Sequence, residues 1–196
     1  CCAMSGNVIR KREPTLSRVG RRPVAIPTGV TVTVDDGVLT AQGPAGVLSR
    51  SIHPNVIVKV EDGAVIVERY SPRKSHRSLH GLYRSLVSNT ITGVANGYQK
   101  TIELVGVGYR AQQSGDGIVL NVGFSHSVDI QPMEGVSLTV EGNNRIHVRG
   151  LDKQLVGEMA ARIRRVRPPD AYKGKGARLS DEIVRLKPGK AGRKVG

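Results

Sequence analysis

A pattern of two short strands followed by an amphipathic helix occurs twice in this chain, about 80 residues apart, which is too long a period for a solenoid repeat. The matching segments are Val58–Gly63 with Leu138–Asn143, Val65–Val67 with Ile146–Val148, and the apolar helical stripe Leu79, Leu82 and Leu86 with Val156, Met159 and Ile163. The repeat predicts an α+β protein. It would contain two tandem copies of a small antiparallel sheet with one covering helix, related by internal duplication.

Turn residues separate short runs of alternating apolar and polar residues before the first helix. Asp-Gly flanked by β-branched residues is a strong hairpin signal, and it occurs at Asp36 and Asp62. An apolar stripe at helical spacing then predicts a helix over Ser75–Ile91. The strands expected in this first copy are Val30–Val34, Val38–Gln42, Val47–Ile52, Ile57–Val60 and Ala64–Arg69.

The second copy repeats this order and ends in a second helix. Asp152 is the expected N-cap of that helix, which runs to Arg165, and Pro168 and Pro169 prevent it from continuing. The expected strands are Tyr98–Val105, Tyr109–Gln113, Ile118–Val122, Ser127–Ile130, Val136–Glu141 and Arg145–Arg149. We therefore predict four regions, namely a leader over residues 1–15, an N-terminal α+β unit over 16–97, a C-terminal α+β unit over 98–180 and a basic tail over 181–196.

The formal net charge of +14 indicates a polyanionic partner. The charge is uneven, because the stretch from Arg162 onward holds twelve Lys and Arg against three Asp and Glu. One Phe, five Tyr and no Trp argue against a large aromatic platform for single-stranded bases. The only cysteines, Cys1 and Cys2, are adjacent and can build neither a disulfide framework nor a zinc site, and no apolar run reaches membrane-spanning length.

The stretch Arg162–Gly176 is the candidate binding site. Arginines at the end of the second helix precede a proline stop, and an extended, glycine-punctuated strip follows that presents an aromatic ring and two lysines. Fixed cations and close backbone approach suit folded RNA, whereas a solvated basic tail is the simpler alternative. Tyr172 could stack on RNA or pack on the helix. The candidate RNA-binding residues are Arg162, Arg164, Arg165, Arg167, Tyr172, Lys173, Gly174, Lys175, Gly176, Arg178, Lys187, Lys190, Arg193 and Lys194.

One or two of the helix arginines are expected to pair with carboxylates or only to stay solvated, because Arg164 and Arg165 point about 100° apart around a helix and cannot share one face. The tail beyond Lys187 is rich in glycine and is expected to order on RNA. No catalytic signature accompanies the site. His76 and His80 have metal-ligand spacing but lack a third ligand, and Gly106–Gly108 lacks the following helix of a dinucleotide loop. We expect no enzyme activity, no metal and no cofactor.

Several ordered motifs between residue 16 and the C-terminus carry a family resemblance. They are Leu16–Pro23, Gly43–Gly46, His76–Leu86, Glu103–Ala111, Asn121–His126, Gly150–Gly157 and Pro168–Gly176. With these motifs the chain resembles bacterial large-subunit ribosomal protein six. The resemblance implies a non-catalytic structural constituent of the cytoplasmic ribosome. It would bind 23S rRNA near the sarcin–ricin region and the base of the stalk through its C-terminal copy and tail. Its partners would include neighbouring large-subunit proteins, with no membrane or small-molecule substrate.

The chain departs from the family pattern at two places. Leu16 stands where the family begins with Met, so we expect residues 1–15 to be an extra leader without folded structure, and a functional basic arm is the alternative. Ala177 stands where a larger aliphatic residue is usual, which weakens packing but not charge. Two rival functions remain for the whole chain. A free-standing RNA chaperone would bind many RNAs alike, and a nucleic-acid enzyme would need clustered carboxylates or a metal set.

Overall fold

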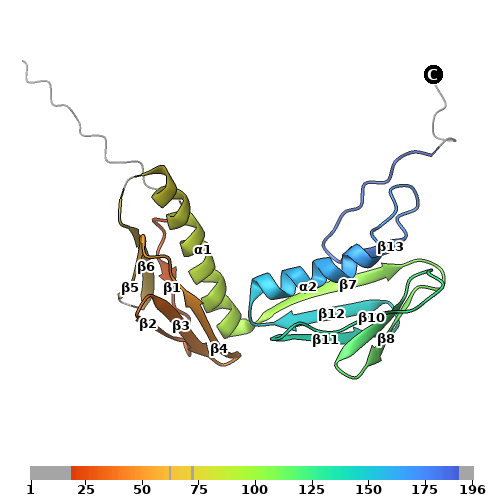
Figure 1. The fold of residues 1–196 in the computed structure, drawn as a ribbon, viewed down its shortest axis with the longest axis horizontal. Coiled ribbons are helices and arrows are strands. Elements are labelled where there is room, and N and C mark those ends of the chain that lie inside the picture. The colour runs from red at the N-terminus through yellow and green to blue at the C-terminus, as the bar shows by residue number, and fades with distance from the viewer. Residues whose placement is uncertain (1–18, 62, 72, 190–196) are drawn as a thin grey trace, which may run out of the picture. The chain divides into compact units, whose positions relative to one another are not determined.

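The computed structural model describes residues 19–61, 63–71 and 73–189, and these form short sheets with two helices (Figure 1). The predicted leader and the tail residues Lys190, Arg193 and Lys194 lie outside the described residues. The chain divides into two compact units. Among the described residues, 19–26, 32–40 and 49–88 belong to the first unit, and 27–31, 41–48 and 89–189 belong to the second. The α+β class with tandem sheets and one helix for each copy is confirmed.

The N-terminal copy holds two three-stranded sheets, with strand orders β1-β6-β5 and β2-β3-β4. In the first of these sheets both neighbouring pairs are antiparallel. The strands are β1 (Val24–Ala25), β2 (Thr31–Asp35), β3 (Val38–Gly43), β4 (Gly46–Ser51), β5 (Val56–Glu61) and β6 (Ala64–Arg69). The two-residue strand β1 was not predicted, because a run this short carries no periodicity.

Helix α1 (Lys74–Asn96) continues five residues beyond its predicted end at Ile91. Thr90, Thr92 and Gly93 have poor helix propensity, but Ile91 and Val94 are buried, and that packing outweighs propensity. None of the helices in the described ranges is long and apolar enough to cross a membrane.

His80, one of the two histidines considered for metal binding, has a structural role. This residue is 2% exposed, and its Nε2 donates a hydrogen bond to the Val67 carbonyl at 2.7 Å. The hydrogen bond ties α1 to strand β6. Within the ranges that the structure describes, no three His, Cys, Asp or Glu residues come together as a potential metal site.

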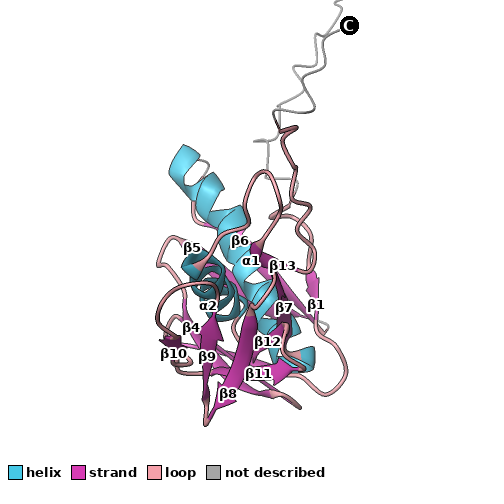
Figure 2. Cartoon of the chain, turned by 90° about the vertical axis from the view of Figure 1, so that its right-hand side faces the viewer, coloured by secondary structure: helices cyan, strands magenta, loops and turns pink. Residues whose placement is uncertain are grey.

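A four-stranded antiparallel sheet, in the order β11-β12-β7-β13, forms the base of the C-terminal copy. Helix α2 (Lys153–Val166) packs against all four strands (Figures 1 and 2). A smaller antiparallel sheet in the order β10-β9-β8 also packs against β11. The strands are β7 (Tyr98–Val105), β8 (Arg110–Ser114), β9 (Gly117–Asn121), β10 (Val128–Ile130), β11 (Val136–Glu141), β12 (Arg145–Gly150) and β13 (Gly176–Leu179).

Alternation along the strands builds the C-terminal core. Ile146 and Val148 of β12 are fully buried with Met159 and Ile163 of α2. The alternate residues of β12, Arg145, His147 and Arg149, lie on the opposite face of the strand. Helix α2 begins as predicted, because the Asp152 side chain accepts a hydrogen bond from the Gln154 amide at 2.9 Å.

The outer edge of β11 is occupied by a side chain from β8. The Gln113 amide nitrogen donates to the Leu138 carbonyl at 3.2 Å, and its amide oxygen accepts from the Val140 N–H at 3.2 Å. One glutamine therefore satisfies a donor and an acceptor that a further strand would otherwise use.

Strand β13 was not predicted, and it begins at Gly176, where the expected extended strip ends. It pairs with the edge of β7, with Ala177 opposite Leu104 and Arg178 opposite Glu103. The chain leaves the sheet after β12, forms α2 and returns to the sheet as the four-residue strand β13. This strand has no run of alternating apolar and polar residues from which it could have been predicted. As a result, the segment between α2 and β13 is fixed at both ends.

Candidate nucleic-acid interface

The α2–β13 loop (residues 167–175) is closed by hydrogen bonds within the main chain. The Ala177 amide donates to the Arg167 carbonyl at 2.8 Å, and the Asp170 amide donates to the Lys175 carbonyl at 2.8 Å. The Asp170 carboxylate accepts from the Lys173 amide at 3.1 Å, and the Asp170 carbonyl accepts from the Gly174 amide at 3.0 Å. This loop has a defined shape, and Asp170 organises its tip.

Asp170 was not among the predicted site residues. The signal was present, because an aspartate shortly after prolines and before glycine is typical of a turn in which the carboxylate caps a following amide. The strand that follows the turn could not be predicted, because this segment lacks an alternating apolar and polar pattern.

Two glycines allow the loop to close. Gly174 has φ +69° and Gly176 has φ +147°, which are conformations that side chains rarely adopt. A Cβ on Gly176 would lie 2.6 Å from the Pro168 carbonyl oxygen and 2.7 Å from the Pro169 Cα, both of them backbone atoms. Glycine is therefore required where the incoming chain crosses the outgoing one.

Several of the predicted cations reach solvent around this loop. Helix α2 presents Arg162 and Arg165, its C-cap Arg167 is also exposed, and the loop adds Lys173 and Lys175. We call these five residues the cationic cluster. Tyr172 is 60% exposed, so its ring is not buried against α2.

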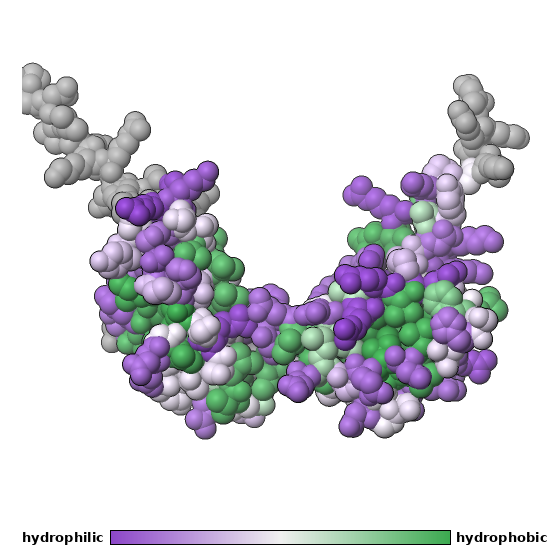
Figure 3. Space-filling model, viewed as in Figure 1, coloured by the Kyte–Doolittle hydropathy of each residue, from purple (hydrophilic) through white to green (hydrophobic). Residues whose placement is uncertain are grey.

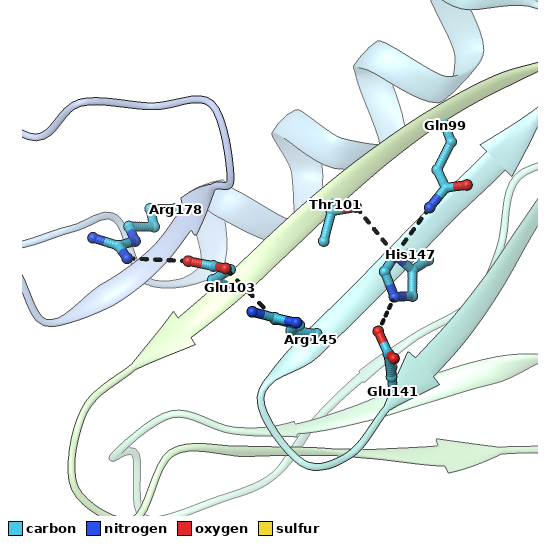
Figure 4. Close-up of polar contacts among 7 residues, drawn as sticks. All are labelled: Gln99, Thr101, Glu103, Glu141, Arg145, His147 and Arg178. Atoms are coloured by element: carbon cyan, nitrogen blue, oxygen red, sulfur yellow. Dashed lines mark hydrogen bonds and ion pairs between the residues drawn. The ribbon is translucent and has the colours of Figure 1, made fainter.

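Two other predicted arginines are held in ion pairs. Arg164 binds Glu182 through two nitrogens, with Nε 2.7 Å from Oε2. Arg178 binds Glu103 at 3.0 Å, and Glu103 also lies 3.6 Å from Arg145 (Figure 4). Arg164 is the helix arginine that pairs with a carboxylate, one of the two expected outcomes, whereas the pairing of Arg178 on β13 was not predicted. The two pairs fix β13 and the following segment.

The Arg164–Glu182 pair predicts a pH-dependent stability. Its hydrogen bond holds the pKa of the Glu182 carboxyl below the ordinary value. A depressed folded-state pKa stabilises the fold above the unfolded-state pKa, and this stabilisation is lost as the pH falls through the folded-state pKa. Because the Arg164 side chain is 37% exposed, solvent screening limits the effect. Glu182→Gln should lower the unfolding free energy at pH 7 by about 1 kcal/mol.

Urea denaturation at several pH values measures this effect. The difference between the wild-type protein and Glu182→Gln should begin to shrink as the pH falls below about 5, where Glu182 of the unfolded chain starts to bind a proton, and it should vanish once the pH is below the lowered folded-state pKa. A difference that stayed constant down to pH 3 would contradict the role of the ion pair.

The segment after β13 returns to the loop. The Lys187 amide donates to the Ala171 carbonyl at 2.7 Å. A cavity of about 390 Å³ lies here. Its lining residues are Val105, Lys173, Gly174, Arg178, Glu182, Ile183, Val184 and Leu186. Figure 3 shows that hydrophilic and hydrophobic side chains both occur on the surface of the C-terminal copy.

The sheet face that alternates with the buried residues carries a polar network (Figure 4). His147 Nδ1 accepts from the Thr101 hydroxyl at 3.0 Å and faces the Gln99 amide nitrogen at 3.1 Å, while its Nε2 donates to Glu141 at 2.8 Å. Neighbouring side chains thus engage both ring nitrogens of His147. The network therefore stabilises the sheet surface.

Comparison with known proteins agrees with this architecture. The family described as ribosomal protein L6 matches residues 26–97 and 105–178, which are the two copies of the repeat. The protein called large ribosomal subunit protein uL6 from Caldicellulosiruptor bescii is 52% identical over 178 residues, covering 91% of this chain and 98% of that protein. The proteins of the same name from Halalkalibacterium halodurans and Geobacillus stearothermophilus are each 53% identical over 178 residues, covering 91% of this chain and 100% of each relative.

The resemblance proposed from the motifs is confirmed by these identities, which extend over most of the chain. The duplicated α+β architecture and the two matched segments lead to the same assignment. The chain belongs to the ribosomal protein L6 family, and its role is that of a structural, non-enzymatic protein of the large ribosomal subunit.

Proposed function

We propose that this protein binds and stabilises 23S rRNA near the sarcin–ricin region and the base of the stalk. The observation that carries the proposal is the cationic cluster, which is mounted on a helix end and on a loop closed at both ends. A cluster on a fixed frame presents its charges at set spacings. A solvated tail would have to order them during binding, at a cost in conformational entropy.

The proposed mechanism is positional. Arg165, Lys173 and Lys175 neutralise phosphates. Gly176 is buried and acts indirectly, because Gly174 and Gly176 allow the closed loop that holds the two lysines. A-form RNA exposes its backbone and 2′-hydroxyl groups more than base identity, so recognition depends mainly on shape. Holding several phosphates on one rigid protein lowers the repulsion between neighbouring RNA helices.

We further propose that the C-terminal unit, residues 98–180, carries the RNA contacts and that the tail, residues 181–196, extends them. Lys187 supports this division, because its amide is bonded to the α2–β13 loop and its side chain is exposed. Neighbouring large-subunit proteins at the stalk base are the proposed protein partners. The proposed location is the cytoplasmic ribosome.

Hydroxyl-radical footprinting of 23S rRNA with the purified protein tests the proposed location. Protection is expected at the sarcin–ricin region and the stalk base, and it should weaken as salt rises because phosphate contacts release counterions. Protection confined to other regions would contradict the proposal.

Sedimentation distinguishes a ribosomal component from the rival role, a general RNA chaperone. A ribosomal component should travel with large subunits at moderate ionic strength, whereas a chaperone that binds many RNAs alike would be released. Recovery of the protein only in the free fraction would favour the chaperone.

A further inference from the structure

We propose that Phe124 and His126 form a stacking site for one unpaired nucleobase beside the cationic cluster. The inference rests on the proposed RNA binding and deepens it, because it assigns a base contact to a surface so far described only by its phosphate contacts. Phe124 is the only phenylalanine in the chain, and it is 40% exposed.

The two rings are already arranged as a stack. Phe124 and His126 have centroids 5.6 Å apart and an interplanar angle of 10°, and His126 is exposed. The guanidinium carbon of Arg167 lies 5.2 Å from the centroid of the Phe124 ring. Three planar groups thus adjoin one another, and planar aromatic and guanidinium groups are the surfaces on which bases stack.

The loop that carries these rings is anchored. It runs from residue 122 to residue 127 between β9 and β10, and it begins with the fully buried Val122. The half-buried Tyr109 ring lies beneath it, since a Cβ on Gly123 (φ +77°) would be 3.1 Å from that ring. The Phe124 ring is therefore presented to solvent by a fixed loop.

Position favours a nucleobase over a protein partner. Arg167 belongs both to this stack and to the cationic cluster, so a base on the rings would have its own phosphates next to fixed positive charge. The loop itself contributes no charged Lys, Arg, Asp or Glu between residues 122 and 127. The scarcity of aromatics argues against a large platform, but two rings are sufficient for a single base.

The chain contains no tryptophan, so a single introduced indole reports on stacking directly. Phe124→Trp and His126→Trp would be titrated with the 23S rRNA fragment that the wild-type protein binds. A base stacked on the pair should quench the fluorescence of at least one of them. Tyr70→Trp is the control, because Tyr70 is 77% exposed and belongs to the first compact unit. Quenching of neither indole, or equal quenching of the control, would overturn the inference.

Affinity measurements give a second readout. Phe124→Leu keeps an apolar side chain but removes the ring, and it should weaken binding about tenfold with an unchanged salt dependence, because no charge is lost. Phe124→Tyr should restore the affinity. Loss of sedimentation with whole subunits at unchanged affinity for the naked RNA would instead assign the rings to a protein partner and overturn the inference. Absence of binding by the wild-type protein would contradict the proposed function itself.

Discussion

The double substitution Lys173→Glu/Lys175→Glu is expected to weaken binding to the 23S rRNA fragment by about a hundredfold. Each lysine is exposed on the α2–β13 loop, and each reversal removes an attraction to phosphate and introduces a repulsion. The slope of log affinity against log salt should fall by about two, because one counterion is released for each phosphate contact. Filter binding over a range of salt concentrations measures both quantities.

The control for net charge is Lys59→Glu/Lys153→Glu, which changes the charge by the same amount. Lys59 lies on β5, and Lys153 begins α2 at the end opposite to Arg165, where a carboxylate suits the helix dipole. This variant should retain most of its affinity. Equal loss in both variants would mean that total charge, and not the cationic cluster, determines binding. Circular dichroism should show that both variants are folded.

Gly176→Ala should have the largest effect on stability, lowering the free energy of unfolding by about 3 kcal/mol. The new Cβ would strike the Pro168 carbonyl and the Pro169 Cα, and the positive φ would be strained as well. Since both obstacles are backbone atoms, no side chain can rotate away to relieve the contact. Urea denaturation measures the change, and RNA affinity should fall with it because the loop must open.

A second glycine provides a control with the opposite sign. Gly157 lies within α2, and a Cβ there would meet no atom within 4 Å. Gly157→Ala should therefore raise the free energy of unfolding by about 0.5–1 kcal/mol, because alanine has the higher helix propensity. If Gly176→Ala unfolded at the same urea concentration as the wild-type protein, the close crossing at Gly176 would not constrain the fold.

The features of the fold that depend on periodicity and local signals were predictable from the sequence. The strand alternation and the Asp152 cap both gave correct elements. The elements that could not be predicted depend on packing between residues that are far apart in the sequence. Strand β13 exists because β7 offers it an edge, and the last turn of α1 forms because Val94 is buried.

The candidate site divides in the same way. Composition and the proline stop were enough to locate the cationic cluster. The partners were not predictable, because Glu182 is 18 residues from Arg164 and Glu103 is 75 residues from Arg178. The Phe124–His126 stack was also missed, since two aromatic side chains within a glycine- and serine-containing loop have no periodic signature.

The glutamine on the edge of β11 has a consequence for the newly made protein before it is assembled. An open strand edge invites a second copy of the chain to add its own strand, which begins aggregation. Gln113 already takes the Leu138 carbonyl and the Val140 amide, so recruitment of another chain at that point would first have to displace a side chain from its own molecule. The same contact therefore protects the unassembled pool against self-association.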